Sequence, residues 1–253
     1  MNVEGKAALI TGGGTGVGRA TALALAERGC AVAVNYSRSR DEAEETASDI
    51  EKLGVRGVAI QADVAADADC RRLVETAVGE LGRLDVLVQS AGVTSFIPHA
   101  NLDDVKDEDW ERIMAVNVKG IFQCARAAKA PMDAAGAGAI VNVSSVAGIA
   151  GVGSSIPYCA AKAAVNSLTV TLARTLAPKI RVNAVAPGFI TGRWLAGGLG
   201  DAYEVVKKAM EARAPLGKVC DPEDVAEAIL ALVSTDLVTG QVVPVEGGML
   251  IAG

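Results

Sequence analysis

The stretch KAALITGGGTGVGRATALALAERG (residues 6–29) decides the fold of this chain. Residues 6–11 form a short apolar run that is typical of a buried strand, and residues 18–29 predict a helix that Gly29 ends. A glycine-rich turn joins the two. This order of strand, turn and helix predicts the first unit of an α/β domain with parallel strands.

Short apolar runs alternate with amphipathic stretches along the rest of the chain. We expect further strands at residues 30–36, 57–63, 84–92, 138–145, 180–188 and 240–248. We expect further helices at residues 41–54, 69–81, 108–130, 157–177, 202–213 and 221–234. Because crossovers between parallel strands are right-handed, this alternation predicts a doubly wound, seven-stranded parallel sheet of Rossmann type. No Pro/Ser-rich linker interrupts it, so residues 1–253 are expected to form a single domain.

The composition excludes several classes of partner. Hydrophobic residues make up 51% of the 253 residues and aromatic residues only 3%, so the core must be built from Ala, Val, Leu and Ile. The net charge of −6 offers no basic surface for nucleic acid or for an anionic membrane. No apolar run reaches the ~18 residues of a membrane span, and the N-terminus has no signal-peptide pattern. We therefore expect no nucleic acid and no membrane as a partner.

The cysteines and the histidine restrict the chemistry. The cysteines are odd in number, scattered and never spaced as Cys-x-x-Cys, so they predict free thiols in a reducing, cytoplasmic compartment. They are Cys30, Cys70, Cys124, Cys159 and Cys220. His99 is the only histidine, and we interpret it as a polar surface residue in a loop. A metal site is therefore not expected.

Glycines in the first turn indicate nucleotide binding. Thr11, Gly12, Gly16 and Gly18 follow the pattern T-G-x-x-x-G-x-G rather than G-x-G-x-x-G. Glycines permit a tight turn and let backbone N–H groups approach a pyrophosphate at the start of a helix. A merely flexible turn is the alternative, but the position of the motif between the first strand and the first helix favours a dinucleotide site.

A second group of residues carries the candidate chemistry. Tyr158 and Lys162 lie four residues apart on one face of a predicted helix, and Ser145 ends the preceding strand. The glycine-rich connection is short enough to let Ser145 and Tyr158 meet. The pKa of a free tyrosine is ~10, and lowering it by ~3 units requires ~4 kcal/mol, about what a nearby ammonium supplies at intermediate dielectric. The alternative is a tyrosine at a helix start and a solvated lysine.

These motifs together resemble the short-chain dehydrogenase/reductase family over essentially the whole chain. The matching segments are TGGGTGVG (11–18), ADV (62–64), QSAG (89–92), AVNVKG (115–120), NVSS (142–145), YCAAK (158–162), NAVAPGFI (183–190) and GQVVPVEGG (240–248). The resemblance implies that Tyr158 is the general acid/base and that Ser145 hydrogen-bonds the substrate oxygen. It implies that Lys162 lowers the pKa of Tyr158 and holds the nicotinamide ribose, and that Asn117 supports a water relay that returns protons.

The same resemblance implies a set of cofactor-binding residues, with adenine near Asp63, adenosine near Gly92 and the carboxamide near Pro187. The full set is Gly12, Thr15, Gly16, Val17, Gly18, Ser37, Arg38, Asp63, Val64, Ala91, Gly92, Tyr158, Lys162, Pro187, Gly188 and Ile190. Two segments depart from the family pattern. Gln89 and Ser90 stand where the family usually has two asparagines, and Gly192 stands where it commonly has a threonine.

The residues after the second strand indicate which dinucleotide is bound. An NAD enzyme of this fold places an acidic side chain there, which accepts hydrogen bonds from the ribose hydroxyls. No acid occurs from Asn35 to Arg40, whereas Ser37 and Arg38 offer donors suited to a phosphate. Arg40 is interpreted as a solvated loop residue. The sequence therefore predicts NADP(H) as the cofactor.

The expected function is hydride transfer between NADP(H) and a ketone or secondary alcohol, with a tyrosine as acid/base. Two alternatives remain open: an epimerase or dehydratase that uses the same Tyr/Lys pair, and a non-catalytic NADP-binding sensor or scaffold. We expect a free small-molecule carbonyl or alcohol substrate, because residues 131–139 contain no Lys or Arg to dock an acidic carrier protein. The alanine-rich helices 108–130 and 157–177, which the family usually pairs between subunits, predict a homotetramer.

Overall fold

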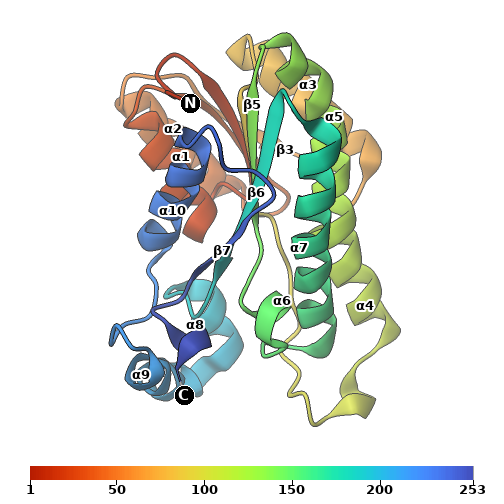
Figure 1. Ribbon diagram of the computed structural model, residues 1–253, viewed down its shortest axis with the longest axis vertical. Coiled ribbons are helices and arrows are strands. Elements are labelled where there is room, and N and C mark those ends of the chain that lie inside the picture. The colour runs from red at the N-terminus through yellow and green to blue at the C-terminus, as the bar shows by residue number, and fades with distance from the viewer. Residues whose placement is uncertain (253) are drawn as a thin grey trace.

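One parallel sheet organises the molecule. The computed structural model describes residues 1–252, and its seven strands lie in the order β3-β2-β1-β4-β5-β6-β7 (Figure 1). They are β1 (Ala7–Thr11), β2 (Ala31–Tyr36), β3 (Gly57–Gln61), β4 (Val86–Gln89), β5 (Gly138–Val143), β6 (Ile180–Pro187) and β7 (Val242–Val245). Strands β1 to β3 are added toward one edge of the sheet and β4 to β7 toward the other, so the strand order reverses between β1 and β4. The doubly wound, seven-stranded fold expected from the sequence is thereby confirmed.

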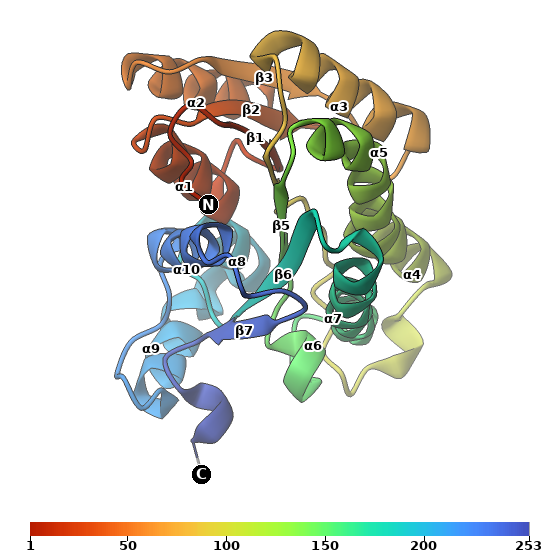
Figure 2. The same cartoon turned by 45° about the horizontal axis from the view of Figure 1, so that its top comes forward.

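Helices cover both faces of the sheet (Figure 2). On one face lie α1 (Gly16–Ala26), α2 (Arg40–Lys52) and α10 (Pro222–Ser234); on the other lie α3 (Asp67–Leu81), α5 (Gly120–Ala134) and α7 (Ile156–Leu176). Side chains alternate between the two cores, so that Ile10 packs under the first group and Leu9 under the second. Small and β-branched residues fill both cores, as the composition predicted.

Several elements differ from their expected bounds. The helix expected at residues 108–130 is α4 (Asp107–Met114) and α5, with a π-helical turn at Ala115–Lys119 between them. Such turns often occur at functional sites. Strand β5 ends at Val143, so Ser145 lies beyond the strand rather than at its last residue. Short helices that were not expected, α6 (Ala147–Ala150) and α8 (Arg193–Leu199), follow β5 and β6, and α9 (Tyr203–Arg213) follows α8.

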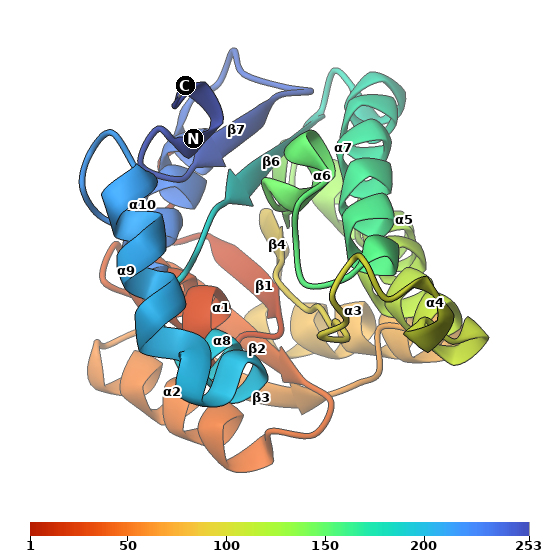
Figure 3. The same cartoon turned by 90° about the horizontal axis from the view of Figure 1, so that it is seen from below.

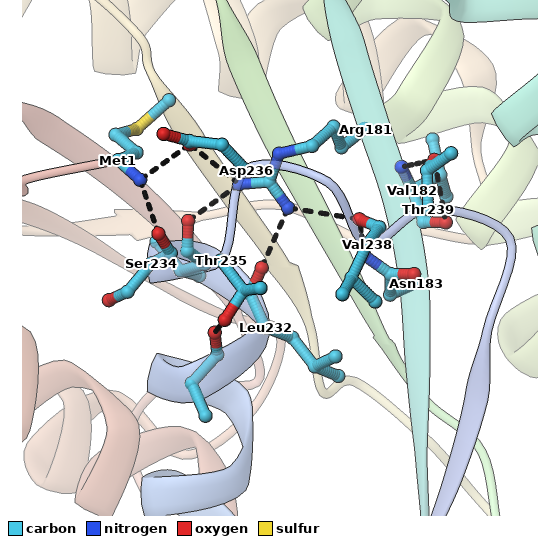
Figure 4. A network of polar contacts seen from close by, with 12 residues as sticks. Met1, Arg181, Val182, Asn183, Leu232, Ser234, Thr235, Asp236, Val238 and Thr239 are labelled. Atoms are coloured by element: carbon cyan, nitrogen blue, oxygen red, sulfur yellow. Dashed lines mark hydrogen bonds and ion pairs between the residues drawn. The ribbon is translucent and has the colours of Figure 1, made fainter.

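A network of polar contacts holds the edge of the sheet opposite β3 (Figure 4). The guanidinium of Arg181, on β6, donates hydrogen bonds to the carbonyls of Leu232 (2.7 Å), Val233 (2.6 Å) and Val238 (3.2 Å). The amine of Met1 contacts the carbonyl of Ser234 at 2.6 Å. The end of α10 and the loop that leads to β7 are therefore attached to β6 and to the start of the chain.

The five cysteines are free and buried, which confirms the prediction of unpaired thiols. Within residues 1–252, no helix is both long and apolar enough to cross a membrane. In the same part of the chain, no three His, Cys, Asp or Glu side chains gather as a metal site would need.

We expect Gly18→Ala to destabilise the fold and Gly79→Ala to stabilise it. A Cβ on Gly18 in α1 would lie 2.2 Å from the Gly12 carbonyl oxygen, whereas one on Gly79 in α3 meets no atom within 4 Å. Overpacking of this kind costs about 1–3 kcal/mol, and replacing an unhindered helical glycine by alanine contributes about 0.5–1 kcal/mol. Urea unfolding of both variants measures the difference, and equal stabilities would contradict the close contact at the first turn.

Candidate active site

A single cleft runs along the carboxyl ends of the strands. It has a volume of about 1980 Å³ and is lined by the turns that follow β1 to β6 and by the segment that contains α8. Helices α6, α8 and α9 lie at this end of the molecule (Figure 3). Ligands of doubly wound sheets bind at this end, where the strand order reverses. All the expected catalytic and cofactor residues line the cleft except Asn117 and Gly18, which are buried beside it.

The glycine-rich turn forms one end of the cleft and suits a pyrophosphate. Gly12 has a φ of +64°, and a Cβ there would lie 2.9 Å from the Cα of Ala91. Helix α1 begins at Gly16, and the side chain of its N-cap residue, Thr15, makes no capping hydrogen bond. The first N–H groups of α1 are therefore free to bind an anion, and the helix dipole favours one.

Asn35 shapes this end of the cleft, and sequence reasoning missed it. Its buried amide nitrogen donates to the carbonyls of Ile60 (3.3 Å) and Ala62 (3.1 Å), and its amide oxygen accepts from the N–H of Gly12 (3.4 Å). One side chain thus connects the ends of β2 and β3 to the glycine-rich turn. The only sequence signal that could have identified Asn35 is the presence of an asparagine near the end of an apolar strand.

The expected catalytic side chains meet in the middle of the cleft. Ser155 caps α7 by accepting a hydrogen bond from the N–H of Tyr158 at 3.4 Å, and the next helical residues include Pro157, which favours a helix start. The Ser145 hydroxyl accepts from the N–H of Ala147 at 3.1 Å. Ser145 is also the side chain whose hydrogen bonding lowers the pKa of the Tyr158 phenol. The structure therefore joins Ser145 and Tyr158, as the short connection predicted.

The pKa of Tyr158 lies above its ordinary value of 10, because burial strips water from the phenolate. The hydrogen bond with Ser145 acts in the opposite direction but is the smaller effect. The net shift is therefore opposite to the lowering expected from the sequence. The Lys162 ammonium lies 5.5 Å from the centre of the Tyr158 ring, and its own effect on this pKa stays a prediction. In this structure desolvation outweighs any attraction between the two groups, so the phenol is held in its protonated form.

Lys162 is itself buried, with only 4% of its surface exposed. Its ammonium donates a hydrogen bond of 2.7 Å to the carbonyl of Val143, at the end of β5. Burial lowers the pKa of Lys162 from 10.5 to about 8. Lys162 is therefore no solvated lysine: it is a cation held inside the cleft, next to Tyr158.

Asn117 lies in the π-helical turn and makes two hydrogen bonds to one residue. Its amide oxygen accepts from the N–H of Val93 at 2.8 Å, and its amide nitrogen donates to the Val93 carbonyl at 2.9 Å. The side chain therefore fixes the loop after β4, which borders the cleft. Its expected part in a water relay stays a prediction.

At one of the positions that depart from the family pattern, Gln89, the structure shows what the side chain does. The amide of Gln89 donates to Asn142 on β5 at 3.0 Å, and Asn142 donates to Thr169 on α7 at 2.9 Å. Gln89 therefore belongs to a buried chain of hydrogen bonds that joins the sheet to α7. The hydroxyl of Thr191 is bound to Asp221.

The residues that follow β2 lie in the open, at the same end of the cleft as Asn35 and the glycine-rich turn. Ser37 and Arg38 are exposed and line the cleft. Arg40 forms an ion pair of 2.7 Å with Glu44 and lies outside the lining, in agreement with its interpretation as a solvated residue. Arg38 forms no ion pair with any residue from 1 to 252, so its guanidinium is free to receive a phosphate.

The segment after β6 covers Tyr158, one of the expected catalytic residues. The ring of Trp194 on α8 meets that of Tyr158 edge-on, with centroids 6.1 Å apart. Gly198 lies flat against Phe96, since a Cβ there would be 2.0 Å from the Phe96 ring. The N–H of Gly192 donates to the hydroxyl of Tyr203 at 3.3 Å. The catalytic part of the cleft is therefore walled by apolar side chains, and His99 lies outside it, 3.8 Å from the thiol of Cys159.

Comparisons with known proteins agree with this geometry. The sequence profile of a family described as enoyl-(acyl carrier protein) reductase matches residues 12–250. The chain is 43% identical to a ketoacyl reductase of the granaticin polyketide synthase of Streptomyces violaceoruber, over 97% of this chain and 96% of that protein. It is 40% identical to a 3-oxoacyl-[acyl-carrier-protein] reductase of Staphylococcus aureus, over 96% of this chain and 98% of that protein.

Solved structures show the same fold. A short-chain dehydrogenase/reductase from Burkholderia xenovorans superposes with a TM-score of 0.90 at 38% identity, over 97% of this chain and 98% of that one. A xylitol dehydrogenase with bound NAD+ superposes with a TM-score of 0.89 at 30% identity, over 98% of this chain and 100% of that one. The fold and the cleft define an oxidoreductase of the nicotinamide-dependent kind. The chain belongs to the short-chain dehydrogenase/reductase family.

Burial of Lys162 predicts a pH dependence of stability. Its pKa is about 8 in the folded protein and 10.5 when unperturbed, so between these values the unfolded chain binds a proton that the folded chain does not. The free energy of unfolding therefore rises with pH in this window, by about 2 kcal/mol from pH 8 to pH 10. Urea unfolding of the wild type and of Lys162→Met at several pH values measures it. The free energy of unfolding of Lys162→Met should not show this rise between pH 8 and pH 10. If it rises with pH as much as that of the wild type, the burial of the lysine is contradicted.

Proposed function

We propose that this protein is an NADP(H)-dependent carbonyl reductase or secondary-alcohol dehydrogenase with Tyr158 as the acid/base. The observation that carries the proposal is the meeting of Ser145, Tyr158 and Lys162 in the same cleft as a glycine-rich turn with free helix N–H groups. When bound, the nicotinamide ring supplies or accepts the hydride. The chain's own residues then handle the substrate oxygen and its proton.

In the proposed reduction, Ser145 and Tyr158 both hydrogen-bond the carbonyl oxygen of the substrate. Tyr158 gives its proton to the oxygen as charge develops there, and its raised pKa means that the phenol is protonated before the reaction. The buried ammonium of Lys162 stabilises the negative charge left on the phenol, in a site where little water screens it. Lys162 also offers a donor to the nicotinamide ribose. Asn117, through Val93, keeps the bordering loop in place.

NADP(H) is proposed over NAD(H) because of the charges at the far end of the cleft. Arg38 is free of ion pairs among the described residues, and Ser37 offers a hydroxyl beside it. The 2′-phosphate of NADP(H) would meet both. No carboxylate occurs from Asn35 to Arg40 to bind ribose hydroxyls. The relatives do not decide the point, since one of the similar structures has bound NAD+.

The proposed substrate is a free small molecule with a carbonyl or secondary alcohol. The side chains over Tyr158 are apolar, with Phe96, Trp194 and Leu195 among the lining residues. Near the end of α5, Lys129 is paired with Asp133 at 2.6 Å, which leaves little positive charge there for an acidic carrier protein. The free, buried cysteines suit a cytosolic enzyme.

Replacement of Tyr158 by phenylalanine tests the chemistry. The variant should keep its fold and bind NADPH, but lose about 10²–10⁴-fold in kcat because a phenyl ring has no proton to give. Tyr203→Phe is the matched control: it keeps the ring contact with Phe189, with centroids 5.7 Å apart, and loses only the 3.3 Å hydrogen bond from the N–H of Gly192, so it should keep most of the activity. A Tyr158→Phe enzyme with a tenth of wild-type activity would show that another group is the acid/base.

Replacement of Arg38 by alanine tests the cofactor assignment. The wild type should use NADPH better than NADH, and Arg38→Ala should lower kcat/KM for NADPH by at least about 10-fold, since a charge-assisted hydrogen bond contributes about 1.5–3 kcal/mol. The value for NADH should change little. A wild type that prefers NADH, or a ratio that the variant leaves unchanged, would refute NADP(H) selection by Arg38.

We also propose a homotetramer. Trp110 on α4 and Phe122 on α5 are 38% and 42% exposed, and the outer surface of α7 is rich in small residues. Burying these faces between copies of the chain removes apolar surface from water. Light scattering at micromolar concentration should give a mass of four chains, or about 103 kDa from 25.7 kDa each. A mass of one chain would rule out the assembly.

A further inference from the structure

One ion pair crosses from the catalytic half of the cleft to the cofactor half. The guanidinium of Arg193, at the first residue of α8, lies 2.6 Å from the carboxylate of Glu42 in the first turn of α2. The two residues are 151 positions apart, and both line the cleft. Figure 3 shows α8 and α2 next to each other at this end of the molecule. Arg193 keeps the pKa of Glu42 below its usual value, so the pair is fully ionised near neutrality.

Glu42 lies at the end of the cleft that is proposed to receive the 2′-phosphate. Helix α2 begins at Arg40, directly after Ser37 and Arg38. Its first turn also packs on the glycine-rich turn, since a Cβ on Gly14 would lie 3.0 Å from the backbone nitrogen of Ala43. Glu42 is therefore placed between the pyrophosphate cradle and the phosphate-binding arginine.

A free carboxylate at this position would oppose the binding of a phosphate. Like charges a few ångströms apart repel, and the repulsion is larger for NADP(H), which carries the additional 2′-phosphate, than for NAD(H). Both carboxylates of α2 that line the cleft have an arginine partner: Glu42 has Arg193, and Glu45 has Arg19 at 3.9 Å. Both of these carboxylates are thus neutralised, while the guanidinium of Arg38 has no ion-pair partner among the described residues.

We propose that Arg193 is a specificity-determining residue for the cofactor, which acts by neutralising Glu42 next to the 2′-phosphate site. Arg193 directly precedes Trp194, whose ring contacts Tyr158. The segment that covers the catalytic residues therefore also sets the charge at the opposite end of the cleft. The inference rests on the proposed preference for NADP(H). In this account Arg38 binds the 2′-phosphate, and Arg193 adds to the preference by neutralising Glu42.

Equilibrium binding measures this effect without turnover. The Kd values of NADPH and NADH, from nucleotide fluorescence, are compared in the wild type, Arg193→Gln, Glu42→Gln and the double variant. Arg193→Gln should lower the preference for NADPH, the ratio of the two Kd values, by about five-fold at low salt, and the effect should shrink at high salt. In the Glu42→Gln background the same substitution should leave the ratio unchanged. Arg40→Gln is the matched control, because it frees Glu44, which lies outside the cleft lining.

Each outcome decides the proposal. A ratio that Arg193→Gln does not change overturns it, and so does an equal loss in the wild-type and Glu42→Gln backgrounds, which would mean that Arg193 does not act through Glu42. The pair is exposed, 64% at Arg193 and 36% at Glu42, so these variants are expected to fold, and their circular dichroism spectra check this. A wild type that prefers NADH would refute the proposed cofactor, whereas the direction of the Arg193→Gln change would still test the coupling between the two residues.

Discussion

The hydrogen bond from Lys162 to the carbonyl of Val143 is the interaction on which the site depends. It joins α7 to the last residue of β5, two residues before Ser145. The next residue adds to the same junction, since the Ser144 hydroxyl contacts the carbonyl of Lys162 at 3.2 Å and the side chain of Asn166. Ser145 then contacts Tyr158. The last residue of β5 and the two residues that follow it are thus attached to one helix, and this fixes the geometry of Ser145, Tyr158 and Lys162.

The cost of this arrangement is a buried cation. Lys162 is removed from water with the carbonyl of Val143 as its hydrogen-bond partner, and its lowered pKa reflects the loss of solvation. Groups of this kind are retained at functional sites, where an ammonium in a low-dielectric cleft interacts strongly with charge that develops nearby. The raised pKa of Tyr158 has the same origin. Burial therefore prepares a proton donor and a cation next to each other.

The cofactor half of the cleft is organised by one side chain in a comparable way. Asn35 connects three turns that come from distant parts of the sequence, and Gly12 and Gly18 allow the close approach that the first of these turns requires. The two halves meet through the segment after β6. Trp194 contacts Tyr158, and its neighbour Arg193 pairs with Glu42 on α2.

The sequence predicted what depends on local pattern. The seven strands follow from apolar runs, and the pairing of Tyr158 with Lys162 follows from helical spacing. It did not predict the π-helical turn around Asn117 or helix α8, because both lack a distinctive periodicity and depend on packing against other elements. The pKa of Tyr158 was expected in the wrong direction, since its burial, in part beneath Trp194 on α8, depends on neighbours that no spacing reveals. The Arg193–Glu42 pair joins residues too distant in sequence for any motif to indicate.

Transfer of a labelled hydride tests the central claim most directly. A panel of ketones is incubated with the enzyme and NADPH that carries deuterium at C4 of the nicotinamide ring, and the alcohol products are analysed by mass spectrometry. We predict one deuterium on the carbinol carbon of a product alcohol, from only one of the two C4 epimers of the labelled cofactor. Consumption of NADPH without deuterium in the alcohol, or binding of NADPH with no reduction of any ketone in the panel, would contradict the account.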